Sequence, residues 1–323
     1  MSISAPGRSF GARPYNDQGA RIFDLPRPRQ RNIRRLYGAK TELMELVWSD
    51  WCPLAGAGRD RRLPKSPGLY RIRCIDTQQL LYIGQTGRSL RQRLGSLRGV
   101  YGAEIPYNDP HTVGPALWAL RQDDQCDFEA SVSELDGDTR SRLEHECVEI
   151  SMHRVRYGHS PAFNFGRMPS GWVKSSGNNA RLVAAGKRFH GYRDPNTVVV
   201  PHAPPPRTLH DDPCATEWMQ FPWRPVSASP PHGISTGVYR ARIPGQAGLV
   251  YLGQGLVAQR IADHTAKSKN ELHRQQTHFS ADLIWEWVDL NGTHRTQLLE
   301  IENDLIASHI ITQGAAPSAQ FLG

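Results

Sequence analysis

GLYRIRCIDTQQLLYIG, residues 68–84, begins with the tripeptide GLY and ends, after eleven intervening residues, with YIG. β-Branched and aromatic residues lie on both sides of a polar connection, which is typical of two short strands joined by a turn. A glycine beside each tyrosine lets a neighbouring backbone or a ligand come close, because glycine has no Cβ. We therefore expect Tyr70 and Tyr82 to face one pocket from adjacent strands.

The pattern returns in the second half of the chain as GVYRARIPGQAGLVYLG, residues 237–253, with Tyr239 and Tyr251 at the same spacing. A basic run follows each copy, RSLRQRL in the first and VAQRI in the second. A single pair of hairpin tyrosines is commonly part of a core. Two copies at identical spacing, each followed by an arginine and later by a glutamate, indicate an internal duplication of one domain.

In the first copy, Ser89 is placed to cap a helix that runs to about residue 98. Arg93 shares a face of that helix with leucines, so its charge is expected to point into a cleft; an arginine stem lying along apolar surface is the alternative. Residues 127–135 alternate like a third strand. His111, in a polar turn, is either a catalytic or phosphate-contacting imidazole or an ordinary turn residue.

A long helix is expected over residues 140–155, and on it Glu146 lies between Leu143 and Ile150. A carboxylate among apolar neighbours needs a partner, and either a hydrated Mg²⁺ or a buried arginine satisfies it. In the second copy the matching side chains are Arg260 and Glu302.

The second copy also carries His264, one helical turn beyond its arginine, where the first copy has Leu97. Asn164, near the end of the first copy, corresponds to Gln320 in the second.

Composition describes a globular chain of 323 residues with 38% apolar residues and enough length for two ordinary cores. No apolar run approaches the ~20 residues that span a bilayer, and the first residues lack the apolar core of an export signal. Five scattered cysteines, none in a CxxC pair, favour a reducing cytoplasm and argue against both a disulfide framework and a zinc site.

Nearly all of the net charge of +8 lies at the N-terminus, where residues 1–40 hold nine basic and two acidic residues. An arginine-rich arm of this kind suits contact with a phosphate backbone, and a solvated tail without a partner is the alternative. The segment 167–216 is rich in Pro, Gly, Ser and Asn and is expected to be a linker with a small hairpin around residues 197–200. It either contacts DNA or packs on a domain.

The expected organisation has four parts: a basic arm (1–41), a first domain (42–166), a linker or DNA-contact segment (167–216) and a second domain (217–323). Both domains resemble the GIY-YIG nuclease domain, over about residues 66–166 and 235–322. The resemblance implies an α+β fold in which a small three-stranded sheet is flanked by helices. Its naming motifs correspond to the GLY and YIG tripeptides of the first copy and to GVY and YLG of the second.

The resemblance also implies roles for single residues. Tyrosines at these positions position or deprotonate the attacking water, the arginine contacts the scissile phosphate, the glutamate is the one carboxylate ligand of the metal, and a late asparagine supports the site. The corresponding residues are Tyr70, Tyr82, Arg93, Glu146 and Asn164 in the first copy, and Tyr239, Tyr251, Arg260, His264 and Glu302 in the second. Leu97 and Gln320 depart from the family pattern.

The sequence thus predicts a Mg²⁺- or Mn²⁺-dependent endonuclease that cuts double-stranded DNA. Two sites joined in one chain favour a restriction-type enzyme that acts as a monomeric pseudo-dimer, because each site can address one strand. A repair nuclease selective for DNA structure or damage is the alternative enzyme. A DNA-binding protein in which one or both domains serve recognition alone is the alternative from another class.

Overall fold

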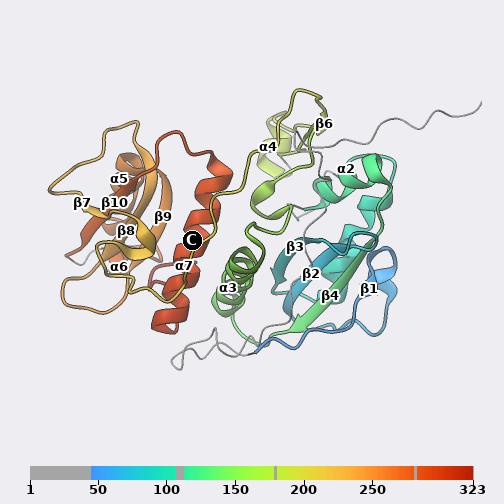
Figure 1. Cartoon of the computed structure of the whole chain (residues 1–323), viewed down its shortest axis with the longest axis horizontal. Coiled ribbons are helices and arrows are strands. Elements are labelled where there is room, and N and C mark those ends of the chain that lie inside the picture. The colour runs from blue at the N-terminus through green and yellow to red at the C-terminus, as the bar shows by residue number, and fades with distance from the viewer. Residues whose placement is uncertain (1–44, 107–112, 178–179, 280–281, 323) are drawn as a thin grey trace, which may run out of the picture. The chain divides into compact units, whose positions relative to one another are not determined.

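Both predicted hairpins are present in the structure (Figure 1). In the first copy β2 (Gly68–Cys74) pairs antiparallel with β3 (Leu80–Thr86), and in the second β8 (Thr236–Arg242) pairs antiparallel with β9 (Tyr251–Leu256). The expected third strands are β4 (Phe128–Glu134) and β10 (Ile284–Asp289), and each pairs antiparallel with the first strand of its hairpin. The mixed helix and sheet content of the prediction is therefore confirmed.

The computed structural model describes residues 45–106, 113–177, 180–279 and 282–322. All of them belong to one unit of the chain, residues 34–323. The predicted basic arm and His111 lie outside the described residues. None of the helices in the described part of the chain has the length and apolar character needed to cross a bilayer.

Each sheet has four strands, so the prediction of three was wrong by one short edge strand. The strand orders are β1-β4-β2-β3 and β7-β10-β8-β9, with β1 at Cys52–Pro53 and β7 at Arg224–Pro225. Both added strands are two residues long and end in proline. Proline has no N–H to donate, and an edge strand tolerates that loss. So short a strand has no periodicity that sequence reasoning could detect.

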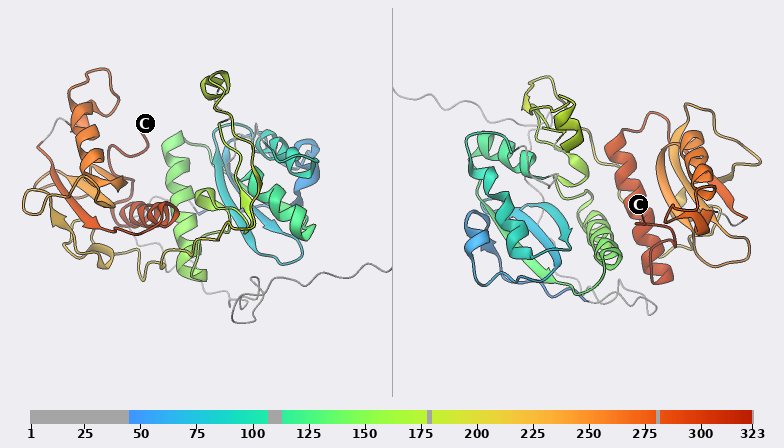
Figure 2. Two further views of the ribbon diagram at one scale, coloured as in Figure 1. Left: turned by 90° about the horizontal axis from the view of Figure 1, so that it is seen from above. Right: turned by 180° about the vertical axis from the view of Figure 1, so that it is seen from behind.

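Helices cover the sheets in the same order in both copies (Figures 1 and 2). Ser89 caps α1 (Leu90–Gly95) as predicted, because its side chain accepts from the amide of Gln92. The α1 helix stops at Gly95, however, and the chain continues as a 3-10 turn, η3 (Ser96–Tyr101). In the second copy the corresponding helix α5 (Val257–Ser268) is continuous.

The long helices that carry the two candidate glutamates are α3 (Thr139–Tyr157), capped by the side chain of Asp138, and α7 (Arg295–Gln313). The remaining elements, in chain order, are η2 (Leu54–Arg59), α2 (Gly114–Asp124), η4 (Asn164–Gly166), β5 (Trp172–Val173), α4 (Ala180–Ala184), β6 (Tyr192–Arg193), η5 (Trp218–Gln220) and α6 (Gln276–Phe279).

Helices α3 and α7 lie side by side in all views (Figures 1 and 2). Asn303 on α7 donates to the backbone oxygen of Cys147 on α3 (3.0 Å), and each of these residues directly follows its copy's glutamate. Beside this contact, Arg154 is fully buried and pairs with Asp304 at 2.9 Å. The two copies therefore meet through corresponding positions of corresponding helices.

The segment 167–216 is packed at both ends. Trp172 donates to Asp123 of the first copy at 2.8 Å, while Arg167 and His202 both contact Glu300 on α7. Residues 197–200 form no hairpin, so that prediction was wrong; the strand pair of this segment joins β5 to β6 instead. A pair of two-residue strands separated by eighteen residues leaves no local pattern to detect.

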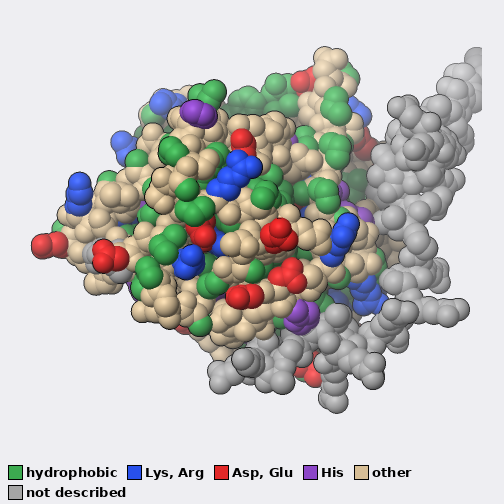
Figure 3. All heavy atoms as spheres, turned by 60° about the vertical axis from the view of Figure 1, so that its left-hand side comes forward, with side chains coloured by type: hydrophobic (Ala, Val, Ile, Leu, Met, Phe, Trp, Pro, Cys, Tyr) green, Lys and Arg blue, Asp and Glu red, His purple; other side chains and the backbone are tan. Residues whose placement is uncertain are grey.

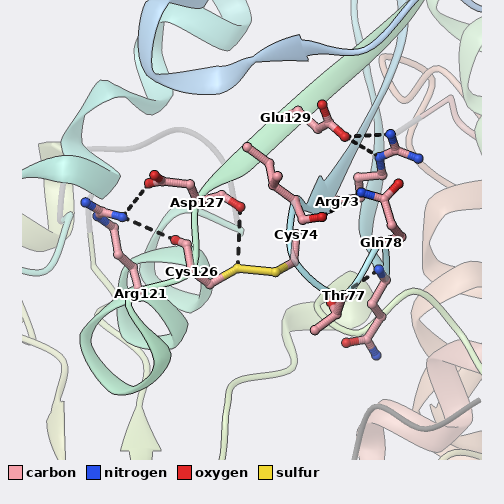
Figure 4. The surroundings of a disulfide bond; sticks show 10 residues. Arg73, Cys74, Thr77, Gln78, Arg121, Cys126, Asp127 and Glu129 are labelled. Atoms are coloured by element: carbon pink, nitrogen blue, oxygen red, sulfur yellow. Dashed lines mark hydrogen bonds and ion pairs between the residues drawn. A yellow bond between two sulfur atoms is a disulfide. The ribbon is translucent and has the colours of Figure 1, made fainter.

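Cys74 and Cys126 form one disulfide (Figure 4), a single bridge that the scattered cysteines of the sequence did not indicate. The register explains it: Cys74 at the end of β2 lies opposite Phe128, two residues beyond Cys126. A spacing of 52 residues hides that proximity in the sequence. The expectation of a reducing compartment consequently loses its argument from the cysteines.

Candidate functional site

Each copy brings its two tyrosines together on neighbouring strands. The ring centroids of Tyr70 and Tyr82 are 6.0 Å apart, and those of Tyr239 and Tyr251 are 6.2 Å apart. Tyr70 lies opposite Gly84 in the strand register, and Tyr239 lies opposite the corresponding glycine. The predicted pairing of two tyrosines in each copy is therefore confirmed as geometry.

Glycine is required at both ends of the motif for steric reasons. A Cβ on Gly84 would come within 2.7 Å of the ring and hydroxyl of Tyr70, and a Cβ on Gly253 would overlap the hydroxyl of Tyr239. At the start of the hairpin, a Cβ on Gly68 would overlap the backbone oxygen of Ser133 on β4. Any larger residue would displace either a tyrosine or a neighbouring strand.

The arginines of the basic runs reach the first tyrosine of each pair. Arg93 and Arg260 form side-chain hydrogen bonds with Tyr70 and Tyr239, respectively. Burial raises the pKa of Tyr70 and Tyr239 well above the ordinary value; the second tyrosine of each pair raises it further, and the arginine opposes both effects. In the protein alone both phenols therefore keep their protons near neutral pH and act as donors.

Glu146 lies on α3 and Glu302 on α7, and both side chains are half-buried. Desolvation raises the pKa of each carboxyl to about 7, and Arg93 or Arg260 acts in the opposite direction. These glutamates are thus poised to ionise near neutrality. A cation that replaced the lost water would favour the charged form.

Asn164 forms hydrogen bonds with the strand that carries Tyr82. Its amide oxygen accepts from the backbone N–H of Ile83 at 3.0 Å, and its amide nitrogen donates to the backbone oxygen of the same residue at 2.8 Å. In the second copy Gln320 accepts from the N–H of Leu252 at 3.2 Å, the position that corresponds to Ile83. The longer side chain of Gln320 thus keeps one of the two contacts with the second strand of the hairpin, β9 in this copy and β3 in the first.

The second copy differs most at its histidine. Nε2 of His264 lies 3.0 Å from the hydroxyl of Tyr239, and the ring packs against Tyr251, Phe279 and Trp285. In the first copy Leu97 is fully buried in the core instead. Sequence reasoning found this histidine but missed the side chain that contacts its other nitrogen, Lys267.

Outside the sites, both copies contain the same cation–π arrangement, which the sequence did not predict. Arg71 lies over Trp48 and Trp51, as Arg240 lies over Trp223 and Trp218, at 4.4–5.9 Å from the ring centroids. These aromatic clusters precede the hairpins in the sequence, and the arginines that they contact lie on the first strand of each hairpin. Both tryptophans of the second copy are buried and offer no stacking platform, whereas Trp48 and Trp51 of the first copy are half-buried.

Charge on the visible surface is mixed. On the face drawn in Figure 3, Lys and Arg side chains are interspersed with Asp and Glu side chains. The middle of the segment 167–216 differs: residues 174–193 contain five basic and no acidic residues, and Phe189 and Tyr192 are 40% and 49% exposed. The ends of the segment pack on the protein, as one interpretation expects, and its middle exposes aromatic and basic residues. Contact of that middle with DNA stays a prediction.

The metal-binding capacity of the described residues is limited. Their one close group of three ligand side chains is Cys74, Asp76 and Cys126, whose sulfurs are joined to each other. Glu146 and Glu302 each offer a single carboxylate. That donor set fits a hydrated Mg²⁺, which keeps several waters and takes one or two carboxylates plus substrate phosphate oxygens.

Comparison with known proteins gives no relative: no protein-family model, curated protein or solved structure matches this chain.

Proposed function

We propose that the chain is a metal-dependent DNA endonuclease with two GIY-YIG-like sites, most consistent with a restriction-type enzyme. The observation that supports this most is the repetition of a whole set: two facing tyrosines, an arginine bonded to the first of them, and a glutamate whose pKa lies near 7. An ordinary buried ion pair or hydrogen bond accounts for any one of these groups by itself. Two copies of all four indicate chemistry.

Cleavage of a phosphodiester needs an aimed water and stabilisation of charge on the phosphoryl oxygens. Arg93 and Arg260 supply a planar, permanently charged donor fork for those oxygens. The tyrosine hydroxyls orient the water through hydrogen bonds, since burial keeps them protonated. Glu146 and Glu302 would each hold a divalent ion, which supplies Lewis acidity at the leaving oxygen.

Two sites in one chain allow each to cut one strand without dimerisation. Residues next to the glutamates contact each other across α3 and α7, so the two carboxylates are tied to a common support. This arrangement supports a pseudo-dimer, in which symmetric duplex DNA meets two similar half-sites.

The test is plasmid cleavage with purified full-length protein, with and without Mg²⁺. Glu146→Ala and Glu302→Ala should each convert double-strand cleavage into nicking, and the double variant should bind DNA without cutting it. Glu271→Ala, which removes an exposed carboxylate, is the control. If one single variant loses all cleavage while the other still linearises the plasmid, only one copy is catalytic.

The same assay separates the alternatives. Cutting at one defined sequence supports the restriction-type enzyme, whereas cutting only at flaps, branches or modified bases supports a repair nuclease. Binding without any metal-dependent nicking would assign both copies to recognition.

A further inference from the structure

His264 has a defined hydrogen-bonding environment at both ring nitrogens. Nε2 lies 3.0 Å from the hydroxyl of Tyr239, and Nδ1 lies 3.4 Å from Nζ of Lys267. The imidazole itself is 1% exposed. Burial, followed by the charges of Lys267 and Arg260, lowers the pKa of His264 to about 3, so the ring is neutral near pH 7 and carries one proton.

Lys267 is held in place from its other side. Nζ donates to the side-chain oxygen of Gln275 at 2.9 Å, and the amide nitrogen of Gln275 donates to the backbone oxygen of Ala319 at 2.7 Å. The amide of Gln275 is thereby oriented, with its oxygen toward the lysine. An ammonium has three donors and no acceptor. Nδ1 of His264 must therefore be the acceptor in its contact with Lys267.

We propose that Lys267 is a positioning residue of the second site, which fixes His264 in the tautomer whose proton is on Nε2. This inference deepens the proposed function and rests on it for its catalytic consequence. With the proton on Nε2, His264 donates to the phenol oxygen of Tyr239. The hydrogen bond of one ring nitrogen thus sets the role of the other.

The opposite tautomer would change the chemistry of Tyr239. A proton on Nδ1 would face the ammonium of Lys267, while Nε2 would accept the phenol proton and hold it inside the protein. In the tautomer fixed by Lys267, the phenol oxygen accepts from His264 and from Arg260. Its own proton is then directed to a different acceptor, and the two donors stabilise negative charge on that oxygen.

The internal duplication supports the coupling of the two residues. Counted from the motif arginine, His264 and Lys267 correspond to Leu97 and Val100 of the first copy, and both of these are fully buried. The imidazole and the ammonium are thus present together in one copy and replaced together by apolar side chains in the other. A lysine needed only for solubility would have no reason to be replaced along with the histidine.

The direct test is NMR of full-length protein labelled with ¹⁵N at histidine, without DNA or metal. The ring-nitrogen shifts of His264, assigned with His264→Gln, should show protonation at Nε2 alone in the wild type. Lys267→Met keeps the aliphatic stem and should shift the ring toward protonation at Nδ1, whereas Lys267→Arg should keep the wild-type tautomer. Lys269→Met, at an exposed neighbour, is the control.

A wild-type ring protonated at Nδ1, or an unchanged tautomer in Lys267→Met, would overturn the inference. This readout does not depend on nuclease activity, so it separates the inference from the proposed function. The activity test uses the Glu146→Ala background, in which only the second site cuts. There Lys267→Met should lower kcat for nicking by about tenfold with little change in KM, a part of the roughly 10²–10⁴-fold that a positioned proton transfer contributes as a whole.

Discussion

Replacing either site glutamate by glutamine should stabilise the metal-free protein at alkaline pH. Burial raises the pKa of Glu146 and of Glu302 from the ordinary 4.5 to about 7. A raised folded-state pKa means that the ionised carboxylate is less favourable in the folded protein than in the unfolded chain. The stabilising contribution of the protonated form is complete below pH 4.5 and is lost as the pH rises through 7.

The magnitude follows from the shift. At about 1.4 kcal/mol per pKa unit, each ionised glutamate lowers the free energy of unfolding by up to about 3 kcal/mol at pH 8. Water that reaches these partly exposed side chains reduces this value, so Glu146→Gln is expected to gain about 1–3 kcal/mol at pH 8. At pH 5 the folded carboxyl is protonated, and the gain should shrink to below about 1 kcal/mol.

The assay is urea denaturation in EDTA at pH 5 and pH 8, with Glu271→Gln as the control at an exposed position. Mg²⁺ should narrow the gap at pH 8, because an ion that binds only the folded wild type stabilises it by mass action. A gain equal at the two pH values would show that glutamine acts through packing. No gain at pH 8 would show that these carboxylates are well solvated, which would refute the reasoning.

Two further predictions concern the N-terminal arm and the side chains of Asn164 and Gln320. Deleting residues 1–41 should weaken binding to duplex DNA and flatten its salt dependence, because fewer counterions are released; an unchanged slope of log affinity against log salt would make the arm a passive tail. Asn164→Ala should lower stability by about 1–3 kcal/mol, and Gln320→Ala by less, because the asparagine makes two hydrogen bonds to the backbone of β3 and the glutamine makes one to the backbone of β9. A larger loss for Gln320→Ala in urea denaturation would contradict this order.

The sequence predicts those parts of the fold that depend on residues close together in the chain. The hairpins follow from glycine, tyrosine and alternating apolar residues within 17 positions, and the start of α1 follows from Ser89. The candidate site residues of the described segments follow from the same local patterns, because the duplication allows each position of one copy to be compared with the other. Gln320 illustrates this: it was noted as a departure, and the structure places it against the backbone that corresponds to the partner of Asn164.

The parts that the sequence did not predict depend on contacts between distant residues. The edge strands β1 and β7 have two residues each, and the disulfide joins cysteines 52 positions apart. Lys267 and His264 are close in the sequence, but the lysine is oriented by Gln275, and Gln275 in turn by Ala319, and both lie outside the helix. A lysine in a helical sequence is normally expected on the solvent-exposed face. Only the structure shows that the ammonium of Lys267 contacts the imidazole of His264.

The contact between α3 and α7 decides whether the two repeats are independent domains or parts of one folding unit. Arg154 is fully buried and pairs with Asp304 of the other copy, and Glu300 accepts from Arg167 and from the backbone N–H of Ala203. Removing one partner of a buried ion pair leaves an uncompensated charge, which costs about 3–5 kcal/mol. Separating the two copies would leave several buried charged groups without their partners at once. The repeats are therefore better described as two halves of one folding unit, in which each glutamate is held in place by a helix that the other half supports.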